Sequence, residues 1–241
     1  MDILDIIFDH PDFVVINKPP GISVQNEAQQ GGILPIICSQ LGLDKLWLVH
    51  RLDKVTSGLL ILAKSAESAG IFGGIFESRK IEKFYIALSA QKPKKKQGTI
   101  AGNMTKVRDG KWMLNKKTDS AAVSQFFSSS LLPGIRLFLI KAHTGKTHQI
   151  RVALKSLSSP ILGDTLYGGD DAERTYLHAY ALRFSFNDQR IELLCPPTMG
   201  EHFVHQTFVQ RLPEYQQPWT WNWPVLPKGL VNQRVIAATL P

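Results

Sequence analysis

Two short segments of this 241-residue chain concentrate side chains that could do chemistry. Residues 50–59 place a carboxylate, Asp53, two positions after Arg51, in a polar stretch between apolar runs. Residues 144–151 form a glycine turn that leads into a helix whose first turns present Arg151. A carboxylate can act as a nucleophile or a general base, and a nearby guanidinium favours its ionised form. The residues alone therefore indicate a basic site with a carboxylate, of a kind that could bind RNA.

Plain structural roles would explain the same side chains. An aspartate in a loop is commonly a turn or capping residue, because its carboxylate accepts hydrogen bonds from nearby backbone N–H groups. Asp53 would then be a turn residue, Arg51 a surface charge and Arg151 a solvated helix residue. Both interpretations stay open at the level of residue types.

Other site chemistries find no support in the sequence. His202 and His205 form an H-x-x-H pair without a cysteine or carboxylate at a useful spacing, so we interpret them as polar helix positions. The chain has neither a phosphate-binding G-x-x-x-x-G-K-[ST] loop nor a G-x-S-x-G elbow. Cys38 and Cys195 lie far apart, which favours reduced core thiols of a cytoplasmic protein. We expect no metal and no cofactor.

Apolar strands and one amphipathic helix are predicted to hold the two segments. Short apolar runs over 46–49 and 58–63 are typical of buried strands, so the turn between them would be held rigidly. Over 147–157, apolar side chains recur at i, i+3, i+4 and i+7, which predicts a helix with one face in the core. A second face of that helix carries three basic side chains, His148, Arg151 and Lys155.

The remaining periodicity predicts more strands than helices. We expect a hairpin at Ile3–Phe8 and Phe13–Asn17, and a helix capped by Ser65 that runs to about Arg79. Further predicted segments are strands at 84–88, 121–127, 135–142, 176–186 and 189–194, a hairpin turn at 108–111, a polar loop at 25–32 and a helix at 201–212. Regular βαβ alternation is lacking, so we predict an α+β fold with a mixed, mainly antiparallel central sheet and flanking helices.

Length and composition favour a single domain. The 241 residues, 44% of them apolar, are enough to bury a substantial core. We assign residues 1–241 to one catalytic domain, with a core at about 8–212 and an extended, tryptophan-containing tail at 213–241 that packs on it. We expect no signal peptide, and no apolar run approaches the roughly 18 residues of a membrane span. We expect a monomeric, cytoplasmic protein without membrane contact.

All of the excess positive charge lies in one basic segment, residues 92–117. It holds nine basic residues against Asp109, a balance of +8 that equals the net charge of the whole chain. Lysines near a polyanion release condensed counterions on binding, so this segment could bind nucleic acid. A solvated lysine-rich loop that serves solubility would have the same composition. Charge alone leaves both uses open.

A longer stretch, residues 50–65 (HRLDKVTSGLLILAKS), closely resembles the signature of the RluA-type pseudouridine synthases, which modify ribosomal and transfer RNA. Four further stretches agree with that family in the same order, namely Phe13–Val24, Lys83–Ala87, Thr144–Gly168 and Leu177–Ala179. The resemblance covers roughly residues 8–195. It implies the pseudouridine synthase fold and an isomerisation that needs no cofactor.

The resemblance also implies roles for individual side chains. Asp53 matches the catalytic aspartate, and Arg51 matches the arginine that fills the gap left when the target nucleotide leaves its stack. Tyr85 matches the tyrosine that packs on the flipped uracil, and Arg151 matches the arginine that pairs with the catalytic carboxylate. Asp53 could attack the ribose, add to the pyrimidine ring or abstract a ribose proton, and the sequence does not distinguish these routes.

Departures from the family pattern concern RNA recognition. Gln25, Ala153 and residues 187–188 stand where members often have histidine or a His-Pro turn. We expect no separate N-terminal RNA-binding module of the kind that many relatives carry, because the motifs begin almost at once. Other cationic side chains are expected to supply part of that affinity, namely Lys94, Lys95, Lys96, His148 and Lys155.

Three functions remain to be compared. The first is an RNA pseudouridine synthase that acts on ribosomal or transfer RNA. The second is a family member that binds RNA but has lost catalysis, which the joint presence of Asp53, Arg51, Tyr85 and Arg151 disfavours. The third is a basic ribosome-associated protein unrelated to the family, which would leave the ordered series of motifs unexplained.

Overall fold

The structure, a computed structural model, describes residues 3–25, 32–117, 119–227 and 230. Its strands are β1 (Ile6–Asp9), β2 (Phe13–Lys18), β3 (Trp47–Leu48), β4 (Ser57–Ala63), β5 (Glu82–Ser89), β6 (Gln97–Lys106), β7 (Trp112–Asn115), β8 (Ala122–Leu132), β9 (Ile135–Ala142), β10 (Leu177–Phe186) and β11 (Gln189–Leu194). Its helices are α1 (Ile33–Leu41), α2 (Ala66–Glu77), α3 (Gln149–Ser156), α4 (Glu201–Val204) and α5 (Gln206–Arg211). Three 3-10 turns are η1 (Thr165–Tyr167), η2 (Leu212–Tyr215) and η3 (Pro218–Thr220).

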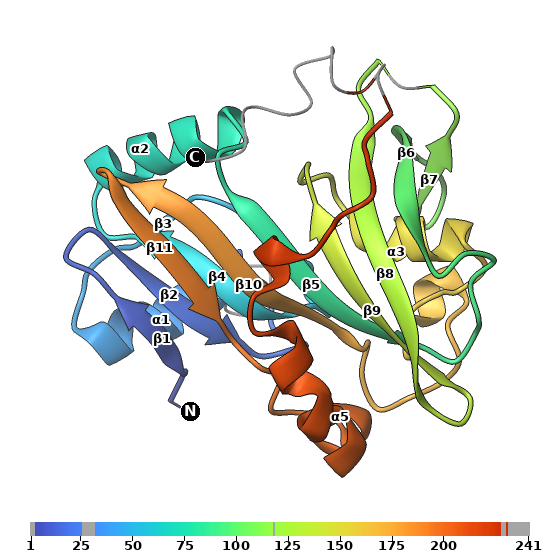
Figure 1. The fold of residues 1–241 in the computed structure, drawn as a ribbon. Helices are drawn as coiled ribbons and strands as arrows, with labels where there is room; N and C mark the ends of the chain where they lie inside the picture. The colour runs from blue at the N-terminus through green and yellow to red at the C-terminus, as the bar shows by residue number, and fades with distance from the viewer. Residues whose placement is uncertain (1–2, 26–31, 118, 228–229, 231–241) are drawn as a thin grey trace.

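One eleven-stranded sheet organises the described residues (Figure 1). Nine strands follow one another in the order β1-β2-β4-β10-β5-β9-β8-β6-β7, while β3 pairs with β4 and β11 with β10. Among these described pairs, β4 and β10 run parallel and the others antiparallel. The predicted α+β fold with a mixed, mainly antiparallel sheet is confirmed.

Alternating apolar side chains give β2 and β4 two buried faces. Phe13 and Val15 of β2 pack on one face with Phe72 of α2. Ile16 of the same strand packs on the other face with Ile37 of α1. Because successive side chains of a strand point to opposite faces, one helix on each side is enough to bury the strand pair.

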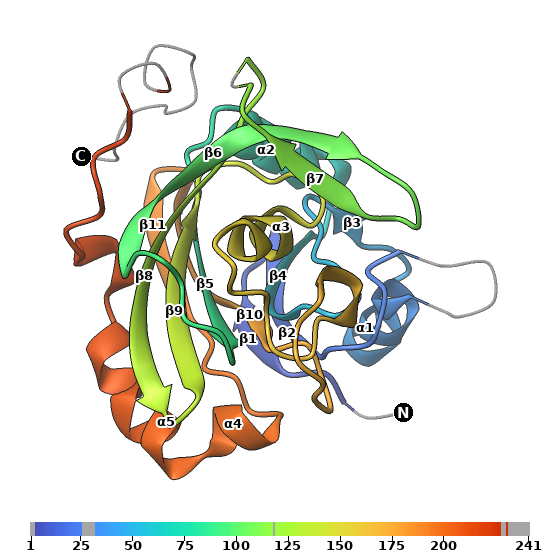
Figure 2. The same cartoon turned by 90° about the vertical axis from the view of Figure 1, so that its right-hand side faces the viewer.

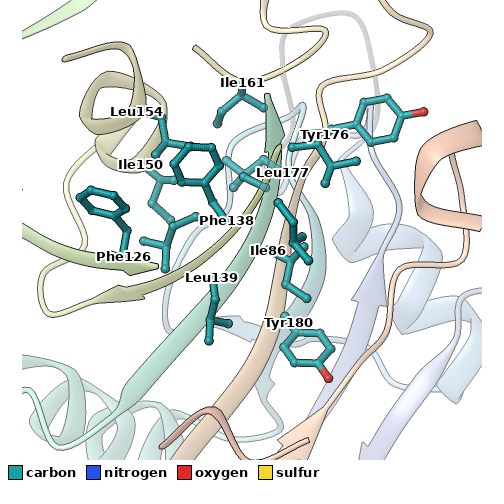
Figure 3. Close-up of a cluster of buried hydrophobic side chains, with 14 of the residues drawn as sticks. Ile86, Phe126, Phe138, Leu139, Ile150, Leu154, Ile161, Tyr176, Leu177 and Tyr180 are labelled. Carbon is teal, nitrogen blue, oxygen red and sulfur yellow. The ribbon is translucent and has the colours of Figure 1, made fainter. Parts of the chain in front are cut away.

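The middle of the sheet is also covered on both faces. α3 lies on one face of β5, β9 and β8, and the C-terminal segment with α5 lies on the other (Figures 1 and 2). Ile150 and Leu154 of α3 point toward Phe138 of β9 (Figure 3). Trp219, from the C-terminal segment, packs edge-on against Phe84 of β5. The predicted apolar stripe therefore fixes α3, and the site residues it carries, against the sheet.

A close approach of β4 to β10 determines where the loop before β4 leaves the sheet. The parallel pairing joins Ser57 to His178 and Gly58 to Ala179. Gly58 has a φ of +105°, and a Cβ there would lie 2.3 Å from the carbonyl oxygen of Ala179, so only glycine fits. The loop with Asp53 immediately precedes β4, so the contact between β4 and β10 determines the position of this loop.

Several boundaries differ from the prediction. The helix predicted at 201–212 is two helices, because His205 is extended and its side chain caps the second one. α3 begins at Gln149 and not at residue 147, because His148 is left-handed with a φ of 55°. The buried strand predicted at 46–49 shortens to β3, which is half-buried. α1 has no counterpart in the prediction.

Other local predictions are confirmed. Ser65 caps α2, and its side chain accepts a hydrogen bond from the backbone N–H of Ser68. Asp109 and Gly110 are left-handed and close the β6–β7 hairpin at the predicted turn. The described part of the tail, residues 213–227, packs on the sheet but contains two 3-10 turns where we expected an extended chain, and most of the tail beyond residue 227 lies outside the described residues. The loop predicted at 25–32 lies almost wholly outside the described residues. Within the described part of the chain, no helix is long and apolar enough to cross a bilayer.

Candidate active site

The loop that carries Asp53 is attached to the sheet on both sides. His50 accepts a hydrogen bond from the Ile61 N–H through Nε2 at 2.9 Å. Burial, and then the charge of Lys83, lowers the pKa of His50 to about 3, so the imidazole is neutral and can accept this bond. On the other side, the Thr56 N–H closes a turn onto the Asp53 carbonyl oxygen at 3.0 Å. The loop is therefore held in one place relative to β4.

Lys18 holds the same loop from the end of β2. Its ammonium donates to the carbonyl oxygens of Pro19, Ile22 and Lys54 at 2.8, 3.0 and 3.2 Å. Burial, followed by the charge of Arg174, lowers the pKa of Lys18 to about 7. The three bonds use all three donors of an ammonium, so the charged form is the one that holds the loop. Lys54, which follows the loop aspartate, is thereby anchored.

A pocket of about 580 Å³ opens beside the loop. Arg51, Asp53 and Tyr85 all line it, so three of the predicted site residues lie together. Arg51 is exposed, whereas the side chain of Asp53 is 23% exposed. A smaller adjoining pocket shares these three side chains and reaches His148. The larger volume is typical of small-ligand sites and would admit a nucleoside.

Tyr85 reaches the pocket from the first half of β5. Burial, and then the negative charge of Asp53, raises the pKa of Tyr85 above its ordinary value, so the phenol stays protonated at neutral pH. In the described part of the chain, no hydrogen-bond partner meets its hydroxyl. A neutral aromatic ring in this position is suited to stacking on a base, as the resemblance implies.

Arg151 lies between two carboxylates, and its main partner differs from the predicted one. Its Nε and Nη2 both donate to Asp164 at 2.8 Å, a bidentate pair. Its Nη1 lies 3.6 Å from Oδ2 of Asp53. We expected Arg151 to pair with Asp53; the structure gives that contact, but from a guanidinium that Asp164 holds. The interpretation of Arg151 as a solvated helix residue is wrong, since it is 5% exposed.

Asp164 is a site residue that the sequence prediction missed. It is 1% exposed and lies in the turn before η1. This turn requires Gly163, whose φ is +76° and where a Cβ would lie 1.8 Å from the Arg174 carbonyl oxygen. The available signal was a single acid within the mainly apolar, glycine-flanked stretch at 160–169, which is typical of a buried carboxylate with a cationic partner.

Tyr167 joins the β6–β7 hairpin to α3. The Trp112 N–H donates to the Tyr167 oxygen at 2.9 Å, and a second hydrogen bond of 2.8 Å joins the tyrosine hydroxyl to Nδ1 of His148. Burial lowers the pKa of His148, which keeps the imidazole neutral. The Arg151 guanidinium and the Lys155 ammonium lie 5.0 and 5.9 Å from the centroid of the Tyr167 ring. His148 and Lys155 therefore lie beside the guanidinium that contacts Asp53.

The basic segment divides into separate parts in the fold. Residues 94–96 are exposed in the connection before β6. The hairpin turn at 108–111 lies beyond the far end of this ten-residue strand, roughly 30 Å away. Because Trp112 ties the hairpin to Tyr167, the hairpin is the part next to the candidate site. The three lysines lie at the opposite end of β6.

Metal ligands do not gather in the described part of the chain. No three His, Cys, Asp or Glu side chains lie close enough together there to hold an ion. The His202 ring packs 5.3 Å from that of Tyr176, and His205 caps α5. Both members of the H-x-x-H pair thus have structural contacts.

Comparisons with known proteins point in the same direction as this geometry. The family described as RNA pseudouridylate synthase matches residues 12–156. The chain belongs to this family. A Haemophilus influenzae protein described as an uncharacterized RNA pseudouridine synthase is 49% identical over 214 residues, which cover 88% of this chain and 96% of the relative. Ribosomal large subunit pseudouridine synthase C of Rickettsia bellii is 33% identical over 186 residues, which cover 72% of this chain and 61% of the relative.

Solved structures share the fold of this synthase. Human RNA pseudouridylate synthase domain containing 4 is 27% identical, with a TM-score of 0.66 over 87% of this chain and 93% of that one. Human RNA pseudouridylate synthase domain containing 1 is 21% identical, with a TM-score of 0.69 over 99% of this chain and 96% of that one. At this identity the likeness shows the fold alone. The predicted pseudouridine synthase fold and the resemblance to the RluA-type enzymes are confirmed, and the protein is an isomerase that acts on RNA.

Proposed function

We propose that this synthase isomerises a specific uridine of a structured RNA, with Asp53 as its catalytic carboxylate. The observation that supports this most directly is the 3.6 Å contact between Arg151 and Asp53, whose carboxylate also lines a pocket of about 580 Å³. The guanidinium stabilises the negative charge of the carboxylate, and the pocket leaves that carboxylate room to meet a substrate.

The reaction sets demands that this arrangement meets. The bond from ribose to ring nitrogen breaks and a bond forms from the same ribose to carbon 5 of the same base, so the base must detach, turn and rejoin without escaping. A pocket retains the base, and Tyr85 offers a ring on which it can stack. Attack on the ribose, addition to the pyrimidine and abstraction of a ribose proton all need an ionised Asp53. In each case Arg151 places a positive charge 3.6 Å from that carboxylate.

The uridine would enter the pocket by base flipping. Extraction of a base from its stack costs a few kcal/mol. Arg51 is exposed at the pocket and would fill the gap that the base leaves, while stacking on Tyr85 would return about 1–3 kcal/mol. Outside the pocket, the side chains proposed to contact RNA phosphates are four lysines and one neutral imidazole, namely Lys94, Lys95, Lys96, Lys155 and His148.

The proposed substrate is ribosomal RNA of the large subunit or transfer RNA. RNA shape and loop contacts supply specificity in such recognition, so the target uridine must be found by experiment. The name of the Rickettsia bellii relative refers to the ribosomal large subunit, which makes ribosomal RNA the first candidate to test.

Pseudouridine mapping of total RNA, from cells with and without the gene, tests the proposal. One site should lose its pseudouridine in the deletion strain, regain it with the wild-type gene and stay unmodified with an Asp53→Ala gene. The synthase proposal fails if no site changes in the deletion strain. RNA binding without any such change would identify the inactive RNA-binding alternative. If the Asp53→Ala gene restored the pseudouridine, the role of the carboxylate would be contradicted but the synthase proposal would stand.

A further inference from the structure

Lys83 is a buried cation in the wall of the pocket that holds Asp53. It precedes Tyr85 by two positions on β5, so both side chains lie on the same face of the strand. Lys83 is 9% exposed and lines the pocket. Its ammonium lies 5.8 Å from the centroid of the Phe76 ring, and a Cβ at Gly145 would lie 3.9 Å from it. Gly145 lines the same pocket, next to this ammonium.

No protein acceptor meets the Lys83 ammonium within the described residues, and no carboxylate there forms an ion pair with it. Its neighbour Glu82 points to the opposite face of β5, where it pairs with Lys141 and Arg183. A buried ammonium without a hydrogen-bond acceptor or a carboxylate beside it is unfavourable. Burial, and then the charge of Arg79, lowers the pKa of Lys83 to about 8. Groups with such perturbed pKa values cluster at functional sites.

The other groups around the pocket leave it with an excess of positive charge. Its acidic lining residues are Asp53 and Glu77, and its basic lining residues are Arg51, Arg79, Lys83 and Lys146. His50 and His143 also line it, but burial lowers their pKa values to about 3 and about 4, so both are neutral. With Arg151 beside Asp53, an anionic part of the substrate is the partner that these surroundings favour.

We propose that Lys83 binds a phosphate oxygen of the RNA backbone next to the flipped uridine, an inference that rests on the proposed function. Uracil and ribose are uncharged, so the negative charge nearest to a bound uridine belongs to a flanking phosphate. An ammonium is a compact point charge with rotatable donors, which suits a phosphate. Lys83 would hold the backbone of the nucleotide while Tyr85 and Asp53 meet its base and sugar.

Full-length Lys83→Met, Lys83→Arg and Lys80→Met variants test this proposal. Lys80 is exposed and lies outside the pocket lining, so it is a matched control. The probe is a short oligouridine, and its affinity is measured against salt concentration. We expect Lys83→Met to weaken binding roughly tenfold and to make the salt slope shallower by about 0.7. Lys83→Arg and Lys80→Met should behave like the wild type. An unchanged slope in a folded Lys83→Met protein overturns the proposal.

A second measurement identifies the phosphate. An oligonucleotide with the mapped uridine receives a neutral methylphosphonate linkage on the 5′ or the 3′ side of that uridine. One of these linkages should weaken wild-type binding as much as Lys83→Met does, and should have no further effect on the Lys83→Met protein. Losses that add would contradict the contact. Pseudouridine formation by the wild type on the unmodified oligonucleotide checks the proposed function separately.

Discussion

Arg151 joins the partly exposed carboxylate of Asp53 to the buried carboxylate of Asp164. Asp164 accepts two of the guanidinium N–H groups at 2.8 Å, and Nη1 lies 3.6 Å from Asp53. Asp164 is 1% exposed, and the turn before η1 fixes it, so it determines where the guanidinium lies. Asp53 therefore has a cation beside it before any substrate binds.

Removal of the Asp164 charge should disturb catalysis through Arg151. We expect Asp164→Asn to lower the single-turnover rate of pseudouridine formation by about 10- to 100-fold, because the guanidinium is no longer held in place. RNA affinity should change little. The free energy of unfolding should fall by about 3 kcal/mol, since the substitution breaks a buried ion pair. Single-turnover kinetics and urea unfolding measure both effects.

Asp171→Asn is the matched control for this prediction, because Asp171 is exposed a few residues further along the same connection. It should leave the rate and the stability unchanged. A folded Asp164→Asn enzyme with the wild-type rate would show that Arg151 does not depend on Asp164 for its position.

The elements with strong local signals could be predicted from the sequence. Ser65 caps α2 through its own side chain, and the left-handed Asp109 and Gly110 close a turn of the expected type. The apolar stripe of α3 gave its packing face. In each case the determining contacts lie within a few residues of one another, so residue types and spacing carry the information.

The partners of the charged side chains could not be predicted in the same way. Arg151 and Asp164 are 13 residues apart, and only the turn at Gly163 brings them together. The lack of a hydrogen-bond acceptor for Lys83 among the described residues depends on which face of β5 Glu82 occupies and on what covers that face. The basic segment looks continuous in sequence, but β6 separates its two ends. Tertiary packing decides all three.

Tyr85 should act through its ring and not through its hydroxyl. Stacking on a base contributes about 1–3 kcal/mol, which corresponds to a loss of roughly 5- to 150-fold in kcat/KM for Tyr85→Leu. Tyr85→Phe keeps the ring and removes only a hydroxyl without a partner in the described residues, so it should stay within about threefold of the wild type. Steady-state kinetics on the mapped RNA compare the two. An equal loss of kcat/KM in both variants would mean that Tyr85 acts through its hydroxyl.

The lysines before β6 are expected to contribute to RNA affinity only. Substitution of Lys94, Lys95 and Lys96 by Gln should make the slope of log affinity against log salt shallower by up to about one unit per lost phosphate contact. The rate at saturating RNA should stay the same, because these lysines lie at the far end of β6. A Lys106→Gln, Arg108→Gln variant gives the corresponding salt slope for the hairpin end of the basic segment, for comparison with the triple variant. An unchanged salt slope in the triple variant would rule out RNA contacts at residues 94–96.

The buried charge of Lys83 should lower the stability of the protein in a pH-dependent way. The folded pKa of about 8 lies below the ordinary value of 10.5, so the unfolded chain binds the proton more tightly. The destabilisation is then complete below pH 8 and disappears as pH rises toward 10.5. Lys83→Met should therefore raise the free energy of unfolding by an amount on the order of 1 kcal/mol at pH 7, with a smaller gain at pH 10. Thermal unfolding across pH measures this. If the free energy of unfolding rose by the same amount at every pH, the cause would be better packing and not the removal of the charge.

The role of Asp53 is tested most directly by the single-turnover rate of pseudouridine formation with purified Asp53→Asn enzyme on the mapped RNA. Asparagine preserves the shape of the side chain but cannot carry the negative charge. We expect pseudouridine formation to become undetectable while RNA affinity and thermal stability stay close to those of the wild type. Product formation by the Asp53→Asn enzyme at a rate within about tenfold of the wild type, a barrier difference of only about 1.4 kcal/mol, would contradict the assignment of the reaction to this carboxylate.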